Sequence, residues 1–344
     1  YLKLLSGITP ADIRKVAAKY LRPENMTLVV LAPEGISAAP APADKKAVEI
    51  SCAKDVLANG IPLLTREDHR LPFVYICMAA GGGLLAENDG NSGITRFMSD
   101  LMIKGTAKRT GAEIAAETES LGGSITPFSG NNSFGLRAVC MSPDAGKFME
   151  IAGDCLLNAG FHEDEIAKQK MFQSAEIAQQ RESPVFLAGE ALRKVIYGAH
   201  PYHLNALGTA TAVEKIRRHD LTGYRNTRVN SSNLVVAVFG DITRAEAKRL
   251  AEKYLSGIGT PPPPAAPRET AKPELPAVTK QRAPREQTIV MMGFPAVDMK
   301  DPLADPMTFL QTAMSDLSSD LGIEVREKRG LAYFVGANFQ KGVD

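Results

Sequence analysis

The sequence has no marked excess of charge of either sign and no long apolar run. Its 344 residues include 40 Lys and Arg against 39 Asp and Glu, which gives a formal net charge of +1. Without surplus positive charge there is no electrostatic argument for binding nucleic acid or an anionic membrane surface. The longest apolar stretches, such as residues 234–239, have the length of a strand and not the roughly 18 residues of a spanning helix. We therefore expect no nucleic-acid partner and no membrane span.

Cysteine is scarce and poorly placed for metal or redox chemistry. The four cysteines, Cys52, Cys77, Cys140 and Cys155, are far apart, and no two of them form a C-x-x-C pair. This spacing argues against a zinc knuckle or a dithiol redox motif, and it does not identify the cellular compartment. The hydrophobic content of 44% and charged content of 23% are ordinary for a globular chain of about two domains.

Two proline-rich segments divide the chain. Residues 32–45 are rich in Pro and Ala, and residues 257–285 contain four consecutive prolines followed by further prolines and charges. Such composition is typical of extended, semi-rigid linkers. We expect a short head over 1–31, a body over 46–256 and a tail over 286–344.

The head repeats a pattern found at the end of the body. Thr9 is typical of a helix N-cap, Pro10 suits the first helical position, and residues 26–31 form an apolar run of strand length. The same order of helix, turn and strand recurs over 220–239. The matching pairs are Asp12 with Asp220 and Asn25 with Asn233, separated by 208 positions in both cases. The head therefore looks like the end of an earlier, related unit.

The body combines helical and strand patterns. An Asn59-Gly60 turn predicts a hairpin over 56–64. Further strands are expected at 73–80, 124–127 and 134–141, and further helices at 111–121, 144–158 and 163–180. Over 94–102, apolar residues recur at helical spacing and predict one buried face, whereas Arg96, Ser99 and Asp100 fall on the other side. The mixture predicts an α+β fold in which helices cover an antiparallel-rich sheet.

Five segments together resemble the insulinase/pitrilysin family of zinc peptidases. They are Gly93 to Thr106, Leu121 to Ser124, Tyr197 to Tyr202, Leu207 to Thr209, and Val325 to Tyr333. They are similar to the family's G-x-x-H-x-x-E-H-x-x-x-K-G-T helix and to its L-G-G-S, Y-G-x-H-P-Y, L-G-T and R-E-K-R-G-L-A-Y stretches. The resemblance implies two related α+β units in each lobe, and two lobes that close around a peptide.

The family's catalytic positions are substituted in this chain. In the H-x-x-E-H motif two histidines bind zinc and the glutamate activates water. The resemblance places Arg96, Ser99 and Asp100 at these positions, and Glu176 at the third zinc ligand. Because a guanidinium does not deprotonate, we expect Arg96 to pair with Glu176, Asp100 or both in place of the metal. The alternative is that these side chains are an ordinary solvated helix surface.

The tail carries the other candidate site. In the family, the Arg and Tyr of the R-E-K-R-G-L-A-Y segment reach into the active site formed with the opposite lobe, and these positions are Arg326 and Tyr333 here. A guanidinium and a phenol suit binding of a substrate carbonyl and its oxyanion. The alternative is a basic helix end followed by a strand, with Tyr333 in a core.

The resemblance implies a role for each part of the chain. Residues 1–31 are expected to be the last helix and strand of a preceding lobe. Residues 46–256 would be the first unit of an inactive lobe, and residues 286–344 a truncated second unit. The chain would then be part of a larger protein whose other lobe carries an intact H-x-x-E-H and zinc, with no metal and no catalytic residue in this part.

The expected function is a non-catalytic lobe of a zinc metalloendopeptidase that closes the peptide chamber and presents Arg326 and Tyr333 to the substrate. The alternative is a structural lobe in a larger complex. Metal-independent catalysis has no nucleophile–base pair to support it. The expected partners are a peptide or protein substrate and a catalytic lobe, either preceding in the same chain or in a homologous subunit. A bacterial protein of the periplasm or cytoplasm is expected.

Overall fold

The computed structural model describes residues 9–22, 26, 51–259, 278–282, 287–315 and 318–343. In the head, α2 (Pro10–Tyr20) begins where Thr9 predicts. The Thr9 hydroxyl accepts a hydrogen bond from the Asp12 amide, and the Asp12 carboxylate accepts one from the Thr9 amide at 2.9 Å. The strand predicted at 26–31 and the linker at 32–45 lie outside the described residues, apart from residue 26.

The body is built on one six-stranded sheet with the strand order β1-β2-β6-β3-β5-β4. The strands are β1 (Ala53–Val56), β2 (Pro62–Glu67), β3 (Phe73–Gly81), β4 (Ser124–Ser129), β5 (Ser133–Met141) and β6 (Leu234–Gly240). β2 and β6 are parallel and the other neighbours are antiparallel. β1 and β2 form the predicted hairpin, with Gly60 at φ +90° in its turn. The prediction of an antiparallel-rich sheet is confirmed.

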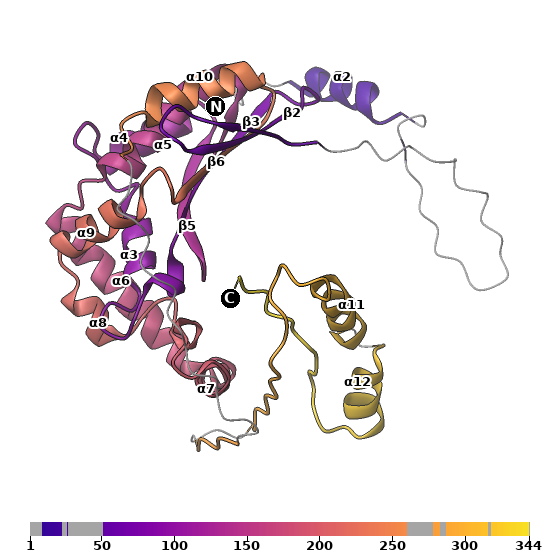
Figure 1. The fold of residues 1–344 in the computed structure, drawn as a ribbon. Coiled ribbons are helices and arrows are strands. Elements are labelled where there is room, and N and C mark those ends of the chain that lie inside the picture. Colours follow the sequence, from indigo (N-terminus) through magenta and orange to yellow (C-terminus); the bar gives the residue numbers. More distant parts are fainter. Residues whose placement is uncertain are drawn as a thin grey trace.

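Helices cover one side of this curved sheet (Figure 1). They are α3 (Ile94–Leu101), α4 (Gly111–Ser120), α5 (Ala145–Asn158), α6 (Glu163–Glu182), α8 (Ala210–Lys215), α9 (Arg218–Arg228) and α10 (Arg244–Leu255). A further helix, α7 (Pro184–Tyr197), follows α6 and packs against α6 and the 201–203 turn. The sequence patterns did not predict α7, α8 or α10. No residue of α7 is fully buried, α8 has only six residues, and two of the four buried side chains of α10 are alanines. α8 and α10 therefore carry a weak apolar pattern, whereas α7 is rich in apolar residues, such as Leu187, Leu192 and Ile196, that are half-buried.

The core lies between the sheet and these helices. On β3 the buried side chains alternate, because successive residues of a strand point to opposite faces. The predicted apolar face of α3 is confirmed, since Ile94, Phe97, Met98, Leu101 and Met102 are all buried in this core. Burying each such side chain contributes about 1.5–3 kcal/mol to folding, so α3 is held firmly whatever its polar residues do.

The tail contains α11 (Ala304–Ser315), α12 (Asp320–Gly322) and a π-helical turn, η5 (Ile323–Lys328). The described residues of 286–344 include no strand. The tail contacts the body at α7, where Gly293 lies so close that an added Cβ would be 2.1 Å from Ile196 Cδ1. The Val343 amide also donates to the Tyr202 hydroxyl at 3.3 Å. The helix-covered α+β fold is thus confirmed, while the division into head, body and tail units stays a prediction.

Candidate functional site

The site is organised by the first turn of α3. Glu87 precedes this helix in the chain, and its buried carboxylate accepts hydrogen bonds from the amides of Gly93 at 2.7 Å and Thr95 at 3.0 Å. A negative group at a helix N-terminus satisfies free amides and interacts favourably with the helix dipole. Burial raises the pKa of Glu87, and these hydrogen bonds oppose the shift. Glu87 is therefore the N-terminal anchor of α3.

Two glycines allow the main chain to cross closely at this turn. Gly93 has φ +89°, and a Cβ on it would lie 2.5 Å from the Leu207 carbonyl oxygen. A Cβ on Gly208 would lie 2.1 Å from the Ser92 carbonyl oxygen. The amide of Gln173, on α6, is fully buried and donates to the carbonyls of Gly93 at 3.2 Å and Leu207 at 2.8 Å. The start of the 93–106 segment and the 207–209 segment therefore lie against each other, and Gln173 of α6 bonds to both.

Arg96 and Asp100 form an ion pair one turn apart on α3. Arg96 Nε lies 2.6 Å from Asp100 Oδ2, and the side chains are 41% and 21% exposed. The side-chain amide of Gln169 donates to the same oxygen at 3.1 Å. Burial raises the pKa of Asp100, and the positive charge of Arg96 opposes the shift. This ion pair is one of the arrangements predicted for Arg96.

One expectation about these positions is wrong. The sequence pattern predicts Ser99 on the polar side of α3, but Ser99 is fully buried, and its hydroxyl has no partner among the described residues. The reason is that α3 packs against the sheet and also against α6, so more than one stripe of the helix is covered.

Glu176 is exposed and, among the described residues, makes no ion pair with Arg96. The reason is that α6 turns Gln173 and Ile177 inward and leaves Glu176 on its outer side. Its charge still helps to raise the pKa of Asp100, although the larger cause is burial. Within the described part of the chain, the cation of Arg96 therefore pairs with one carboxylate, that of Asp100, which is the single-partner form of the predicted arrangement.

The chemistry of these side chains does not fit a zinc ion. Zinc sites take thiolate, imidazole or carboxylate ligands, usually three from the protein in a catalytic site. Here the positions hold a guanidinium, a buried hydroxyl, a carboxylate bonded to that guanidinium, and an exposed carboxylate. Across the described ranges, His, Cys, Asp and Glu do not gather in groups of three that could hold a metal ion.

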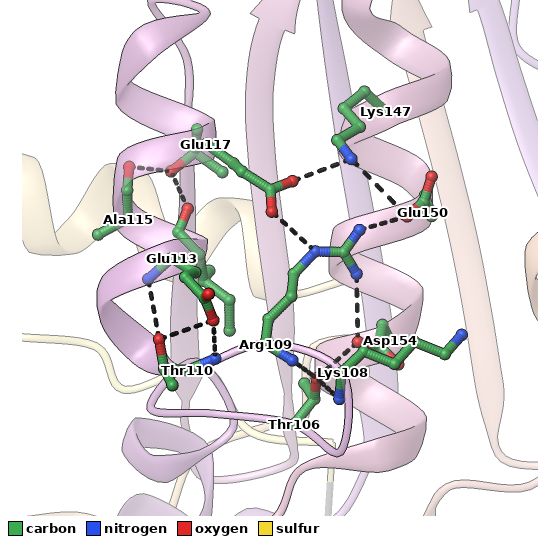
Figure 2. A network of polar contacts seen from close by, with 12 residues as sticks. Thr106, Lys108, Arg109, Thr110, Glu113, Ala115, Glu117, Lys147, Glu150 and Asp154 are labelled. Atoms are coloured by element: carbon green, nitrogen blue, oxygen red, sulfur yellow. Dashed lines mark hydrogen bonds and ion pairs between the residues drawn. The ribbon is translucent and has the colours of Figure 1, made fainter.

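A cluster that the sequence reasoning missed supports α3 from its other end (Figure 2). Arg109 lies between α4 and α5 and forms ion pairs with Glu117 at 3.1 Å, with Asp154 at 3.4 Å, and with Glu150. The hydroxyl of Thr106 donates to Asp154 at 2.7 Å. The K-G-T part of the motif is therefore structural: it fastens the loop after α3 to α5. One sequence pattern could have indicated part of this arrangement. The T-x-x-E capping pattern at Thr110 marks the start of α4 and so the end of the loop that holds Thr106 and Arg109.

Arg326 and Tyr333 lie side by side in the tail. The guanidinium carbon of Arg326 is 5.3 Å from the ring centroid of Tyr333, which is a cation–π distance, and Arg326 Nε lies 3.6 Å from a Glu327 oxygen. The Tyr333 side chain is 88% exposed, so it is not in a core within the described part of the chain. Their role in substrate binding stays a prediction.

A serine, a histidine and an aspartate also meet on the body, but in the wrong order for nucleophilic catalysis. His69 Nδ1 lies 2.6 Å from one oxygen of Asp241, and the Ser142 hydroxyl donates to the other oxygen at 2.6 Å. Because the serine bonds to the acid and not to the imidazole, it has no general base. The hydrogen bonds to Asp241 and Glu67 raise the pKa of His69.

Two family models match this chain, and their matched ranges include the segments that carry the motifs. The family model described as Insulinase (Peptidase family M16) matches residues 63–210, and the model described as Peptidase M16 inactive domain matches residues 215–343. A relative named an uncharacterized zinc protease, from Rickettsia bellii, is 27% identical over 285 residues, which is 82% of this chain and 68% of that protein.

Two further proteins bear on the fold and the role. Human cytochrome b-c1 complex subunit 1 is 25% identical over 203 residues, 59% of this chain and 42% of that protein. The crystal structure of a peptidase M16 inactive domain from Pseudomonas fluorescens superposes with a TM-score of 0.73 at 22% identity, covering 85% of this chain and 71% of that one. No described helix is long and apolar enough to cross a bilayer. With its two halves matched by the two models of one family, the chain belongs to the insulinase family of peptidases, M16.

Proposed function

We propose that this chain is a non-catalytic lobe of a two-lobe zinc endopeptidase, and that it helps to enclose the peptide. The observation that carries the proposal is the Arg96–Asp100 ion pair at 2.6 Å. It occupies two motif positions on a helix whose packing, capping and flanking loops are otherwise those of a well-formed element. The fold of the site is kept while its ligands are replaced, which suits a lobe that supports a catalytic partner.

In this proposal Arg326 and Tyr333 contact the substrate bound at the opposite lobe. The exposed phenol and the neighbouring guanidinium offer donors to a peptide carbonyl and to the oxyanion that forms when it is attacked. The substrate backbone would bind as an extended strand at a sheet edge. In the body, β4 is the edge strand that packs beside α3. Zinc would be supplied by the catalytic lobe, and a bacterial periplasm or cytoplasm is the proposed compartment.

A second candidate is a structural lobe in a larger assembly. It is favoured by the similarity to cytochrome b-c1 complex subunit 1, whose name makes it a subunit of a complex. The two candidates differ at Arg326 and Tyr333, because only the first requires these side chains to face a peptide.

The test combines this lobe with its catalytic lobe and measures peptide hydrolysis. Changing Arg326→Ala and Tyr333→Phe together should lower kcat/KM by about 10²–10³-fold, the usual cost of losing an oxyanion donor, with the melting temperature unchanged. Arg329→Ala is the matched control, because Arg329 is an exposed neighbour that pairs with Glu324. Unaltered turnover in the double variant would favour the structural candidate. Metal analysis of this chain alone should find no stoichiometric zinc.

A further inference from the structure

The sheet carries opposite charges on its two faces. On the helix-covered face, the strand residues Asp55 and Glu67 both accept hydrogen bonds from Arg244 of α10, at 2.7 Å and 2.8 Å. The charged strand residues of the other face, by the alternation along each strand, are Lys54, Arg66 and Arg137. Arg66 is paired with Asp68, which directly follows β2, at 3.8 Å, so Lys54 and Arg137 are the cations considered below. Figure 1 shows α3 to α6 and α8 to α10 gathered on one side of the sheet. We call this the basic face.

The strand register places the cations around an apolar centre. One cross-strand row runs Lys54, Leu64, Ala237, Cys77, Arg137, Thr126, and the next contains Arg66, Phe239, Tyr75 and Val139. Neighbouring strands are about 4.8 Å apart, so Lys54 and Arg137 are separated by roughly 19 Å. The side chains between them, Leu64, Ala237 and Cys77, are half-buried. In the second row Phe239 and Tyr75 are half-buried and Val139 is exposed.

Arg137 is held in position by its neighbours. Its guanidinium carbon lies 4.4 Å from the ring centroid of Phe128. Phe128 is opposite Gly135, where an added Cβ would lie 3.1 Å from the ring, so the absence of a side chain leaves room for it. Burial raises the pKa of the adjacent Cys77 thiol, and the positive charge of Arg137 opposes that shift. No carboxylate of the described residues forms an ion pair with Arg137.

We propose that the basic face binds an acidic peptide segment, with Arg137 holding a carboxylate at one end of an apolar stretch. A guanidinium on an aromatic ring is well placed for a two-bond contact with a carboxylate. An extended chain advances about 3.3 Å per residue, so a segment with acidic residues about six positions apart spans the distance from Arg137 to Lys54. Nucleic acid fits less well, because its phosphates are closely spaced and the cations here are separated by apolar side chains.

This proposal rests on the proposed function, because it names the class of peptide that the lobe would select. The test measures fluorescence anisotropy of the purified chain with two labelled peptides. One carries two Glu residues about six positions apart with apolar residues between them, and the other carries Gln in their place. We expect the Glu peptide to bind about tenfold more tightly, with a difference that shrinks in high salt.

Two variants locate the interaction. Arg137→Gln should reduce the preference for the Glu peptide to within about twofold. The control, Arg249→Gln, removes an equal charge from α10 on the helix-covered side and should leave the preference intact. Equal binding of the two peptides, an equal loss in both variants, or tighter binding of a single-stranded oligonucleotide would overturn the proposal. If neither peptide binds, the basic-face proposal likewise fails. The proposed peptide-enclosing function fails separately, if the Arg326→Ala and Tyr333→Phe variant hydrolyses peptide at the unaltered rate.

Discussion

Replacing Arg109 by methionine should destabilise the body more than any surface change near the motif. The Arg109 side chain is 12% exposed, and its guanidinium serves three carboxylates on two helices (Figure 2). Asp154 is the decisive partner, because its side chain is only 5% exposed. Methionine keeps most of the apolar volume of the arginine stem, so the change isolates the loss of charge.

The expected loss in the free energy of unfolding depends on the hydrogen bonds and solvent contact that each carboxylate keeps after Arg109 is removed. Removing one partner of a buried ion pair costs about 3–5 kcal/mol. Asp154 keeps hydrogen bonds from Thr106 at 2.7 Å and Asn158 at 2.8 Å, which places the cost at the lower end. The pairs with Glu117 and Glu150 are about one third exposed and contribute less. We expect a loss of about 3 kcal/mol, or a fall in melting temperature of roughly 6–12 °C for a domain of this size.

Calorimetry or circular dichroism of the thermal transition measures this loss. The double change Arg109→Met with Asp154→Asn should recover part of the stability, because it removes the orphaned buried charge while Asn can still accept from Thr106. The exposed ion pair of Arg249 offers a control whose removal should barely move the transition. A loss below about 1 kcal/mol for Arg109→Met, or no recovery in the double variant, would refute the reasoning.

Three other expectations concern the motif and its surroundings. Arg96→Ala should cost no more than about 0.5 kcal/mol, because its pair with Asp100 is partly exposed and within one helix; a large fall in melting temperature would contradict this. Gln173→Leu should cost about 2–3 kcal/mol in urea unfolding, since it leaves two buried carbonyls without their donor; a neutral result would show that they find another partner. The pKa of His69 is raised by Asp241, so its stabilising effect is complete below pH 6.5 and is lost as pH rises through the higher folded value. Melting curves from pH 6 to 9 should therefore fall less steeply for His69→Ala than for the unaltered chain, and parallel curves would exclude the effect.

The fold was more predictable than the site because the two depend on different kinds of signal. The apolar spacing of α3 and the Asn59-Gly60 turn are local patterns, and both identified their elements correctly. The burial of Ser99 could not be read in this way, since it depends on α6 packing across α3 from a distant part of the sequence. The number of residues between Glu176 and the motif likewise predicted that Glu176 lies near it. It could not predict which side of α6 faces α3, and in the structure Gln173 faces inward and Glu176 does not.

The central position of β6 has a consequence for how the chain is made. β6 is the strand that joins β2 to β3, so before it arrives the sheet exists as a hairpin and a separate three-stranded antiparallel sheet in the order β3-β5-β4. During synthesis the ribosome releases β6 last of the six, roughly ten to thirty seconds after β3 at ordinary elongation rates. Over that interval the nascent chain displays two unpaired strand edges, which are templates for aggregation. Chaperone capture of the nascent chain should therefore be strongest before residue 240 emerges and should fall once it does.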